Sequence, residues 1–146
     1  MVELKIYLKR KWTDILFYTI FFVLLIGQLQ VTLGKPVSLA AFVAVESNSM
    51  VPTFERGDIL LVLRTDEIRE GEIILFRSQF GSPIVHRVIE IKDNGYITKG
   101  DNNPTTDQAR MGIIKKEQVL AEVFDINGYI FKVPKLGYLS LWIRGR

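Results

Sequence analysis

The longest uncharged run in the chain, Ile15 to Gly34, restricts most strongly what this sequence can fold into. Its 20 residues, ILFYTIFFVLLIGQLQVTLG, are bracketed by Asp14 and Lys35. As a helix rising about 1.5 Å per residue, the run would be about 30 Å long, which matches the hydrocarbon core of a bilayer. The run therefore predicts a transmembrane helix over 13–34.

Two other interpretations of this run compete with a retained anchor. The basic start, the apolar core and later small residues such as Ser38 and Ala40 also fit a cleaved signal peptide. A buried core helix is the third interpretation, although the run shows no polar face at helical spacing. Three polar residues near its end would lie at the far interface or against a partner helix, namely Gln28, Gln30 and Thr32.

The net charge lies almost entirely in front of this run. Residues 1–12 hold four basic side chains against Glu3, which accounts for the whole formal net charge of +3, so the rest of the chain is balanced. A short basic tail beside an apolar run is typical of a cytoplasmic segment that orients the helix, which places everything after residue 35 on the outer or luminal side. Because the folded part is balanced, we expect no nucleic-acid partner.

Two residue types set limits on the chemistry. The chain has no cysteine and a single histidine, His86. Disulfides, thiol nucleophiles and ordinary zinc sites are therefore excluded, and no acidic loop of the EF-hand type is present, so we expect neither a metal nor another cofactor. Any histidine base must be His86, the side chain whose ordinary pKa suits that task near neutral pH.

Short β-branched runs cut by turn residues follow Lys35-Pro36 and predict strands. They cover 37–45, 58–64, 72–78, 84–91, 95–100 and 120–126. Their spacing favours a mainly β, antiparallel domain over 35–134, either a sandwich or a coiled open barrel. Residues 135–146 hold an apolar stretch too short to span a membrane, which is expected to form a last strand, an interfacial segment or the stump of a longer helix.

The pair Asn94-Gly95 predicts a two-residue hairpin turn with positive φ at both positions. In the register that this turn sets, with Asp93 opposite Tyr96, His86 faces Asn103 and lies beside the loop 101–107. A bulge would shift this register. Two carboxylates lie in that loop, Asp101 and Asp107.

Three motifs stand in order behind the apolar run: SNSMVPTFERGD (47–58), HRV (86–88) and KGDNNPTTD (99–107). This ordered set resembles the type I signal peptidases, specifically their archaeal and endoplasmic-reticulum branch. The resemblance covers the apolar run and residues 46–107. It implies a membrane-anchored serine peptidase domain of mostly β structure.

The resemblance also implies a role for particular residues. It places the nucleophile on Ser49 and the general base on His86, where the bacterial branch has a lysine. It places a carboxylate on Asp107 and a second important acid on Asp101, and leaves open which of them orients the base. The oxyanion would be stabilised by the hydroxyl of Ser47 and the backbone N–H of Ser49.

Each of these residues has an ordinary structural interpretation as well. Ser47, Ser49 and the nearby Pro52 suit a turn, and Asp101 suits a turn cap. His86 would then be a half-buried strand residue, and Asp107 a solvated loop carboxylate.

The function implied by the resemblance is removal of signal peptides from exported preproteins after small residues. Apolar pockets from 38–45 and 72–84 would read those residues, with the substrate added as a β-strand. The expected partners are preprotein signal peptides, the lipid bilayer and a larger membrane protein complex. The expected place is an archaeal cell membrane, because no second long apolar segment is present, with the endoplasmic-reticulum membrane as the alternative.

Two functions of other classes remain open at this point. A self-cleaving, phage-repressor-type serine peptidase has a similar domain, but it requires a DNA-binding module and a lysine base. A membrane-anchored β domain without catalysis would bind a partner instead.

Overall fold

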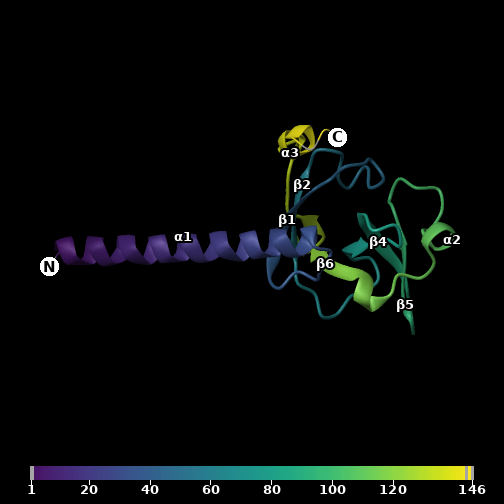
Figure 1. Ribbon diagram of the computed structural model, residues 1–146, viewed down its shortest axis with the longest axis horizontal. Helices are drawn as coiled ribbons and strands as arrows, with labels where there is room; N and C mark the ends of the chain where they lie inside the picture. Colours follow the sequence, from purple (N-terminus) through teal and green to yellow (C-terminus); the bar gives the residue numbers. More distant parts are fainter. Residues whose placement is uncertain (1, 144, 146) are drawn as a thin grey trace.

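The computed structural model describes residues 2–143 and 145. A long helix, α1 (Val2–Thr32), projects from a β domain, as Figure 1 shows. Its segment Lys11–Thr32 is long and apolar enough to cross a membrane, and only 6% of its most apolar window is buried. A core helix would be mostly buried, so the low burial contradicts that interpretation of the apolar run.

The β domain is built on one open antiparallel sheet in the order β1-β2-β6-β3-β4-β5, with β9 also paired to β2. The strands of this sheet are β1 (Ala40–Ala44), β2 (Ile59–Leu63), β3 (Ile73–Arg77), β4 (Pro83–Lys92), β5 (Gly95–Lys99), β6 (Val119–Val123) and β9 (Lys132–Val133). Each of the six predicted runs overlaps one of these strands. The mainly β, antiparallel and open architecture is confirmed, and the sheet is not closed into a barrel.

The smaller elements lie at the ends of this sheet. A separate hairpin joins β7 (Asp125–Ile126) to β8 (Tyr129–Ile130). The short helices are α2 (Gln108–Met111), the 3-10 turn η1 (Lys116–Gln118) and α3 (Tyr138–Ile143). β7 lies at the end of the predicted run 120–126, and a helix was one of the expectations for the segment of α3. β8, α2 and η1 were not among the sequence predictions, because each offers too few residues for a periodic pattern.

β3 lies at the centre of the sheet and is buried on both faces. Ile73 and Leu75 belong to one apolar cluster, whereas Ile74 and Phe76 belong to a second. Because side chains alternate along a strand, β3 divides the core into two halves. β4 pairs with β3 along its first half, with His86 directly opposite Ile74. His86 therefore lies on the strand beside the buried central strand of the domain.

The predicted register of the β4–β5 hairpin is wrong. Lys92 pairs with Gly95, and the register shifts again between Val88 and Glu90. Asn94 does not adopt the positive φ that the predicted Asn94-Gly95 turn needs, since the described non-glycine residues with positive φ lie elsewhere. Gly95 opens β5 at a φ of 147°, where a Cβ would lie 2.2 Å from the carbonyl oxygen of Ile114. Gly95 serves this close approach and not the turn.

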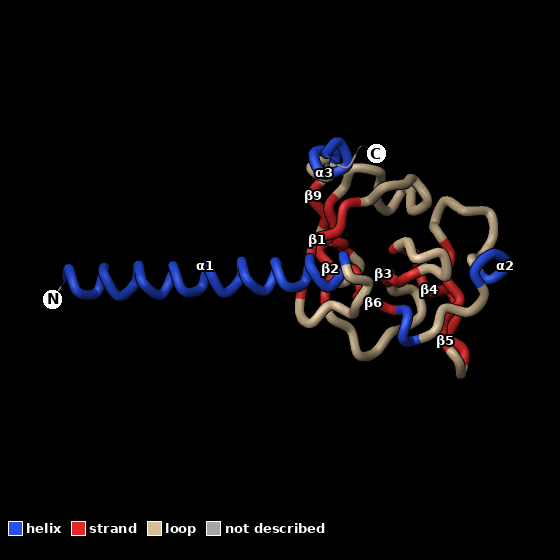
Figure 2. Tube along the Cα trace, viewed as in Figure 1, coloured by secondary structure: helices blue, strands red, loops and turns tan. Residues whose placement is uncertain are grey.

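The C-terminal apolar stretch forms α3, so the expectation of a last strand there is wrong. Figure 2 shows α3 and β9 at the end of the domain from which α1 leaves. Three apolar side chains of α3 are more than half exposed: Leu139, Trp142 and Ile143. Contact of this segment with a membrane interface stays a prediction.

Candidate active site

His86 forms hydrogen bonds with both Ser49 and Asp107. Its Nδ1 lies 2.6 Å from Asp107 Oδ2, and its Nε2 lies 3.0 Å from Ser49 Oγ. In the neutral imidazole whose Nδ1–H donates to the carboxylate, Nε2 is an acceptor that faces the serine hydroxyl. This is the arrangement of a nucleophile, a base and a group that orients the base.

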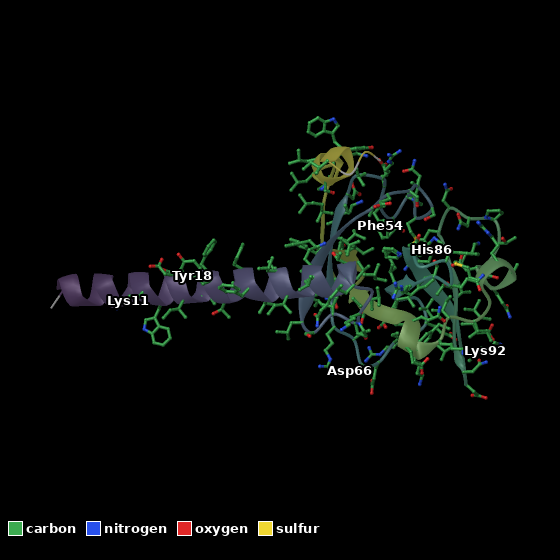
Figure 3. All side chains as sticks on the ribbon, in the orientation of Figure 1. Lys11, Tyr18, Phe54, Asp66, His86 and Lys92 are labelled. Atoms are coloured by element: carbon green, nitrogen blue, oxygen red, sulfur yellow. The ribbon has the colours of Figure 1, made fainter. Side chains whose placement is uncertain are left out.

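Strand packing and one loop fix the base and its carboxylate. His86 is 6% exposed, and its ring meets the Phe76 ring edge to face with 6.4 Å between centroids. Figure 3 shows His86 on the β domain, well away from the projecting part of α1. Asp107 follows β5 and is tied back to it, since its N–H donates to the Thr98 carbonyl and Thr98 Oγ1 donates to Asp107 Oδ2 at 2.7 Å. Asp107 is 6% exposed, so the interpretation of this residue as a solvated loop carboxylate does not fit.

The loop after β5 also holds the segment that carries Ser49. The Asn102 N–H donates to the Ser49 carbonyl at 2.8 Å, and the Asn102 side chain donates to the Asn48 carbonyl. Gly100 allows this approach, because a Cβ there would lie 2.7 Å from the Ser49 carbonyl oxygen. Gly100 and Asn102 were not among the predicted residues, although both stand in the KGDNN motif. Met50 is buried beneath the same segment.

Asp101 bonds to the neighbour of His86 and not to His86 itself. Its two carboxylate oxygens accept hydrogen bonds from the Arg87 guanidinium at 2.9 and 2.7 Å, and Thr53 Oγ1 donates to it as well. Burial by itself would raise the pKa of Asp101, but the hydrogen bonds from Arg87 and Thr53 outweigh it and hold that pKa below its ordinary value. Asp101 therefore stays ionised and ties β4 to the segment that follows Ser49.

Ser47 lies beside the nucleophile candidate. Its Oγ is 3.1 Å from Ser49 Oγ, and the Ser49 N–H points to it over a long 3.5 Å contact. Both groups expected to stabilise an oxyanion, the Ser47 hydroxyl and the Ser49 N–H, are thus adjacent to the Ser49 hydroxyl. The structure brings together Ser47, Ser49, His86 and Asp107, whereas Asp101 contacts Arg87, which is one residue further along β4 than His86.

A cleft of about 670 Å³ opens at Ser49 and His86. Both segments expected to form substrate pockets contribute to its walls, with Phe42 to Val45 from the first, and Leu75, Pro83 and Ile84 from the second. The C-terminal end of α1 forms part of the wall as well.

Comparison with known proteins assigns the family. Residues 26–124 match the Peptidase S24-like family, which is more than half of the chain. The chain belongs to this family. It is 44% identical over 99 residues to the signal peptidase complex catalytic subunit SEC11C of Homo sapiens, an alignment that covers 62% of this chain and 50% of that protein. The predicted resemblance to signal peptidases is confirmed.

Two yeast proteins extend the match. The signal peptidase complex catalytic subunit SEC11 of Zygosaccharomyces rouxii is 38% identical over 114 residues, covering 73% of this chain and 67% of that protein. The corresponding protein of Scheffersomyces stipitis is 39% identical with the same coverage. The chain spans about half the length of the mammalian relatives that it matches. These relatives are eukaryotic, so they do not support the expectation that the chain is archaeal.

The pairing of Asp101 with Arg87 predicts a large stability effect. Its side chains are 17% and 30% exposed, whereas the surface pair of Asp66 with Arg64 has side chains 75% and 59% exposed. Asp101→Asn removes the charge and leaves Arg87 uncompensated, so we expect a loss of about 2 kcal/mol in the free energy of unfolding. Asp66→Asn is the matched control, with an expected loss below about 0.5 kcal/mol. Thermal unfolding in detergent, followed by intrinsic fluorescence, measures both.

The same pair predicts the sign of a pH effect. Because the folded pKa of Asp101 lies below its ordinary value of 3.8, its contribution to stability is present at neutral pH and is lost as the pH falls from 3.8 through the lower folded value. Asp101→Asn is expected to lose less stability than the wild type over that acid range. Equal destabilisation by Asp101→Asn and Asp66→Asn at pH 7 would contradict this account.

Proposed function

We propose that this protein is a membrane-bound serine endopeptidase that removes N-terminal signal peptides from exported preproteins. The observation that carries the proposal is the hydrogen-bonded line Ser49–His86–Asp107 at the cleft. Membership of a family that includes signal peptidase catalytic subunits supports the choice of substrate. Histidine in the position of the base, together with an apolar helix in front of the domain, argues against a self-cleaving repressor.

In the proposed reaction, Ser49 Oγ attacks the carbonyl carbon of the peptide bond while His86 Nε2 takes the hydroxyl proton. Asp107 accepts the Nδ1–H bond and stabilises the imidazolium that forms. The negative charge on the carbonyl oxygen is stabilised by the Ser49 N–H and the Ser47 hydroxyl. His86 then gives the proton to the leaving amine, and water, deprotonated by His86, hydrolyses the ester on Ser49.

Free strand edges on both sides of the cleft favour an extended substrate. β1 is the edge strand of the sheet and pairs with β2 alone, and its residues Phe42 to Ala44 line the cleft. The first half of β4, Pro83 to His86, pairs with β3 but not with β5. Both edges offer unpaired backbone groups to a peptide that adds as a strand. Alternate side chains of such a peptide would point into the wall, which fits small residues at the first and third positions before the cut.

The proposed place of action is a membrane, with the N-terminus cytoplasmic and the β domain on the opposite side. The basic residues before the apolar helix support this orientation. Confinement to the bilayer plane raises the effective concentration of a substrate whose own apolar helix lies in the same membrane. A cell membrane and the endoplasmic-reticulum membrane both fit this topology, and a membrane protein complex remains a proposed partner because the mammalian relatives are named as subunits of one.

Reconstituted protein tests the proposal directly. The full chain in liposomes, incubated with a reporter preprotein, is expected to cut once, after a small residue. A bulky aromatic residue at the position before the cut is expected to lower cleavage by about 100-fold, because the proposed specificity is for small side chains at that position. Mass spectrometry of the products locates the cut. Absence of any cleavage, or a cut that ignores the size of that residue, would refute the proposed function.

A further inference from the structure

One wall of the cleft is formed by the C-terminal end of α1. The cleft that holds Ser49 and His86 is also lined by Gln28, Val31 and Thr32. Figure 1 shows this end of α1 reaching the domain beside β1. A peptide that fills the cleft therefore touches the helix that, under the proposed function, anchors the protein.

The helix comes this close to the sheet because of Gly27. A Cβ at Gly27 would lie 1.8 Å from the carbonyl oxygen of Ala40, so any side chain would push helix and sheet apart. Residues 11–22 of α1 are exposed, whereas Gly27 is buried and Val31 packs on the core of the domain. Gly27 thus marks the level at which α1 first packs against the peptidase domain, although Leu29 further along the helix is still more than half exposed.

Of the three polar side chains at this level, Gln28 has free hydrogen-bonding capacity. The Gln30 side chain accepts a bond from the Ser38 N–H at 2.8 Å, and Thr32 Oγ1 donates to the Gln28 carbonyl at 2.9 Å. Among the described residues the Gln28 side-chain amide has no hydrogen-bond partner, although it is half-buried in the cleft wall. An amide carries two N–H donors and one acceptor. The half-buried Gln28 amide is therefore available to a ligand in the cleft.

The next step rests on the proposed function. A signal peptide has an apolar helix in the bilayer, and it must become extended before it reaches Ser49. The last carbonyl groups of a helix have no partner within the helix, and little water is available at this depth to satisfy them. Since Gln28 lines the cleft one residue after α1 first packs on the domain, we expect the change from helix to strand to take place there.

We propose that Gln28 binds the substrate backbone at the point where its apolar helix ends, by donating Nε2–H to one of the unpaired carbonyl oxygens. Arg77 strengthens this assignment. Its guanidinium lies across the end of α1, since a Cβ at Gly34 would be 2.7 Å from it, and it lines the same cleft. A positive charge at this point favours the negative end of the substrate's helix dipole.

Gln28 therefore measures where the substrate helix stops. The number of residues between that stop and Ser49 is then set by the protein, which selects the peptide bond that is cut. Peptides that contain the cleavage segment without an apolar helix would not use this contact.

Two substrates with the same cleavage segment test the proposal. One is a preprotein that keeps its apolar helix and is incorporated in the same liposomes as the full-length enzyme, and the other is a soluble peptide without the helix. Gln28→Leu is expected to lower the ratio of kcat/KM for the preprotein to that for the peptide by about tenfold, mainly through a higher KM. Gln28→Met, which also keeps a helix-forming residue of similar length, is expected to give the same change.

Gln30→Leu is the matched control, because it makes the same substitution two positions further along α1 at a side chain that bonds to Ser38 and does not line the cleft. It is expected to leave the ratio within about twofold, since the residue touches no substrate. An unchanged ratio in Gln28→Leu, or an equal change in Gln30→Leu, would overturn the assignment of Gln28 while leaving the proposed function intact. Failure of the wild type to cleave either substrate would overturn both.

Discussion

Ser49→Ala is expected to lower kcat/KM for preprotein cleavage by about 10⁵-fold or more, and His86→Ala by a similar factor. Ser49 Oγ and His86 Nε2 are 3.0 Å apart and act as one unit, so removal of either stops both attack and proton transfer. The double variant is for the same reason expected to lose no more than either single one. Cleavage of a reporter preprotein by each purified variant in liposomes gives the rate.

Two further variants sharpen this test. Ser82→Ala changes an exposed serine and is expected to cleave at the wild-type rate. His86→Lys is expected to stay inactive, because Asp107, 2.6 Å from the imidazole, would hold a buried lysine in its charged form, which cannot accept a proton. Cleavage by Ser49→Ala at even a few per cent of the wild-type rate would show that another residue is the nucleophile.

Asp107→Asn is expected to lower kcat by about 10⁴-fold with little change in KM. Asp107 Oδ2 accepts hydrogen bonds from both His86 Nδ1 and Thr98 Oγ1. A neutral amide at this position no longer stabilises the imidazolium, and with its NH₂ turned to Nδ1 it selects the tautomer whose Nε2–H points at Ser49. Steady-state kinetics gives the kcat and KM split, and ¹⁵N chemical shifts of the single histidine report its tautomer.

Asp101→Asn separates this orienting role from a purely structural one. Asp101 contacts Arg87 and Thr53 but not His86, so at a temperature well below its own Tm this variant is expected to keep the wild-type histidine tautomer and to lose much less activity than Asp107→Asn. Equal losses of kcat in both variants, with both folded, would contradict the assignment of separate roles to the two carboxylates.

The strands were predictable because each is a short β-branched run with turn residues at both ends. The apolar helix was predictable for a similar reason, since a run of 20 uncharged residues has few ways to satisfy its backbone. The hairpin register was not, because Gly95 suited a two-residue turn equally well but is needed where β5 passes close to Ile114. A helix was only one of the expectations for the segment of α3, because six residues are too few for the helical period to decide between helix and strand.

The single histidine and the ordered motifs were enough to select Ser49, His86 and two carboxylates from the sequence. They left open which carboxylate orients the base, since Asp101 and Asp107 lie in one loop. Strand geometry decides this point: His86 and Arg87 are neighbours on β4 and point to opposite faces, so one carboxylate meets the imidazole and the other meets the guanidinium.

By itself, the sequence determined the elements of this protein and the residue types available for chemistry, because hydrophobic period, turn residues and composition are local properties. Only the tertiary structure decided which of those residues meet: the side of β4 that each aspartate reaches, the contact of the KGDNN loop with the Ser49 segment, and the place of Gln28 in the cleft wall. The physical reason is that such contacts depend on strand register and on close backbone approaches at Gly27, Gly95 and Gly100, which no local pattern encodes.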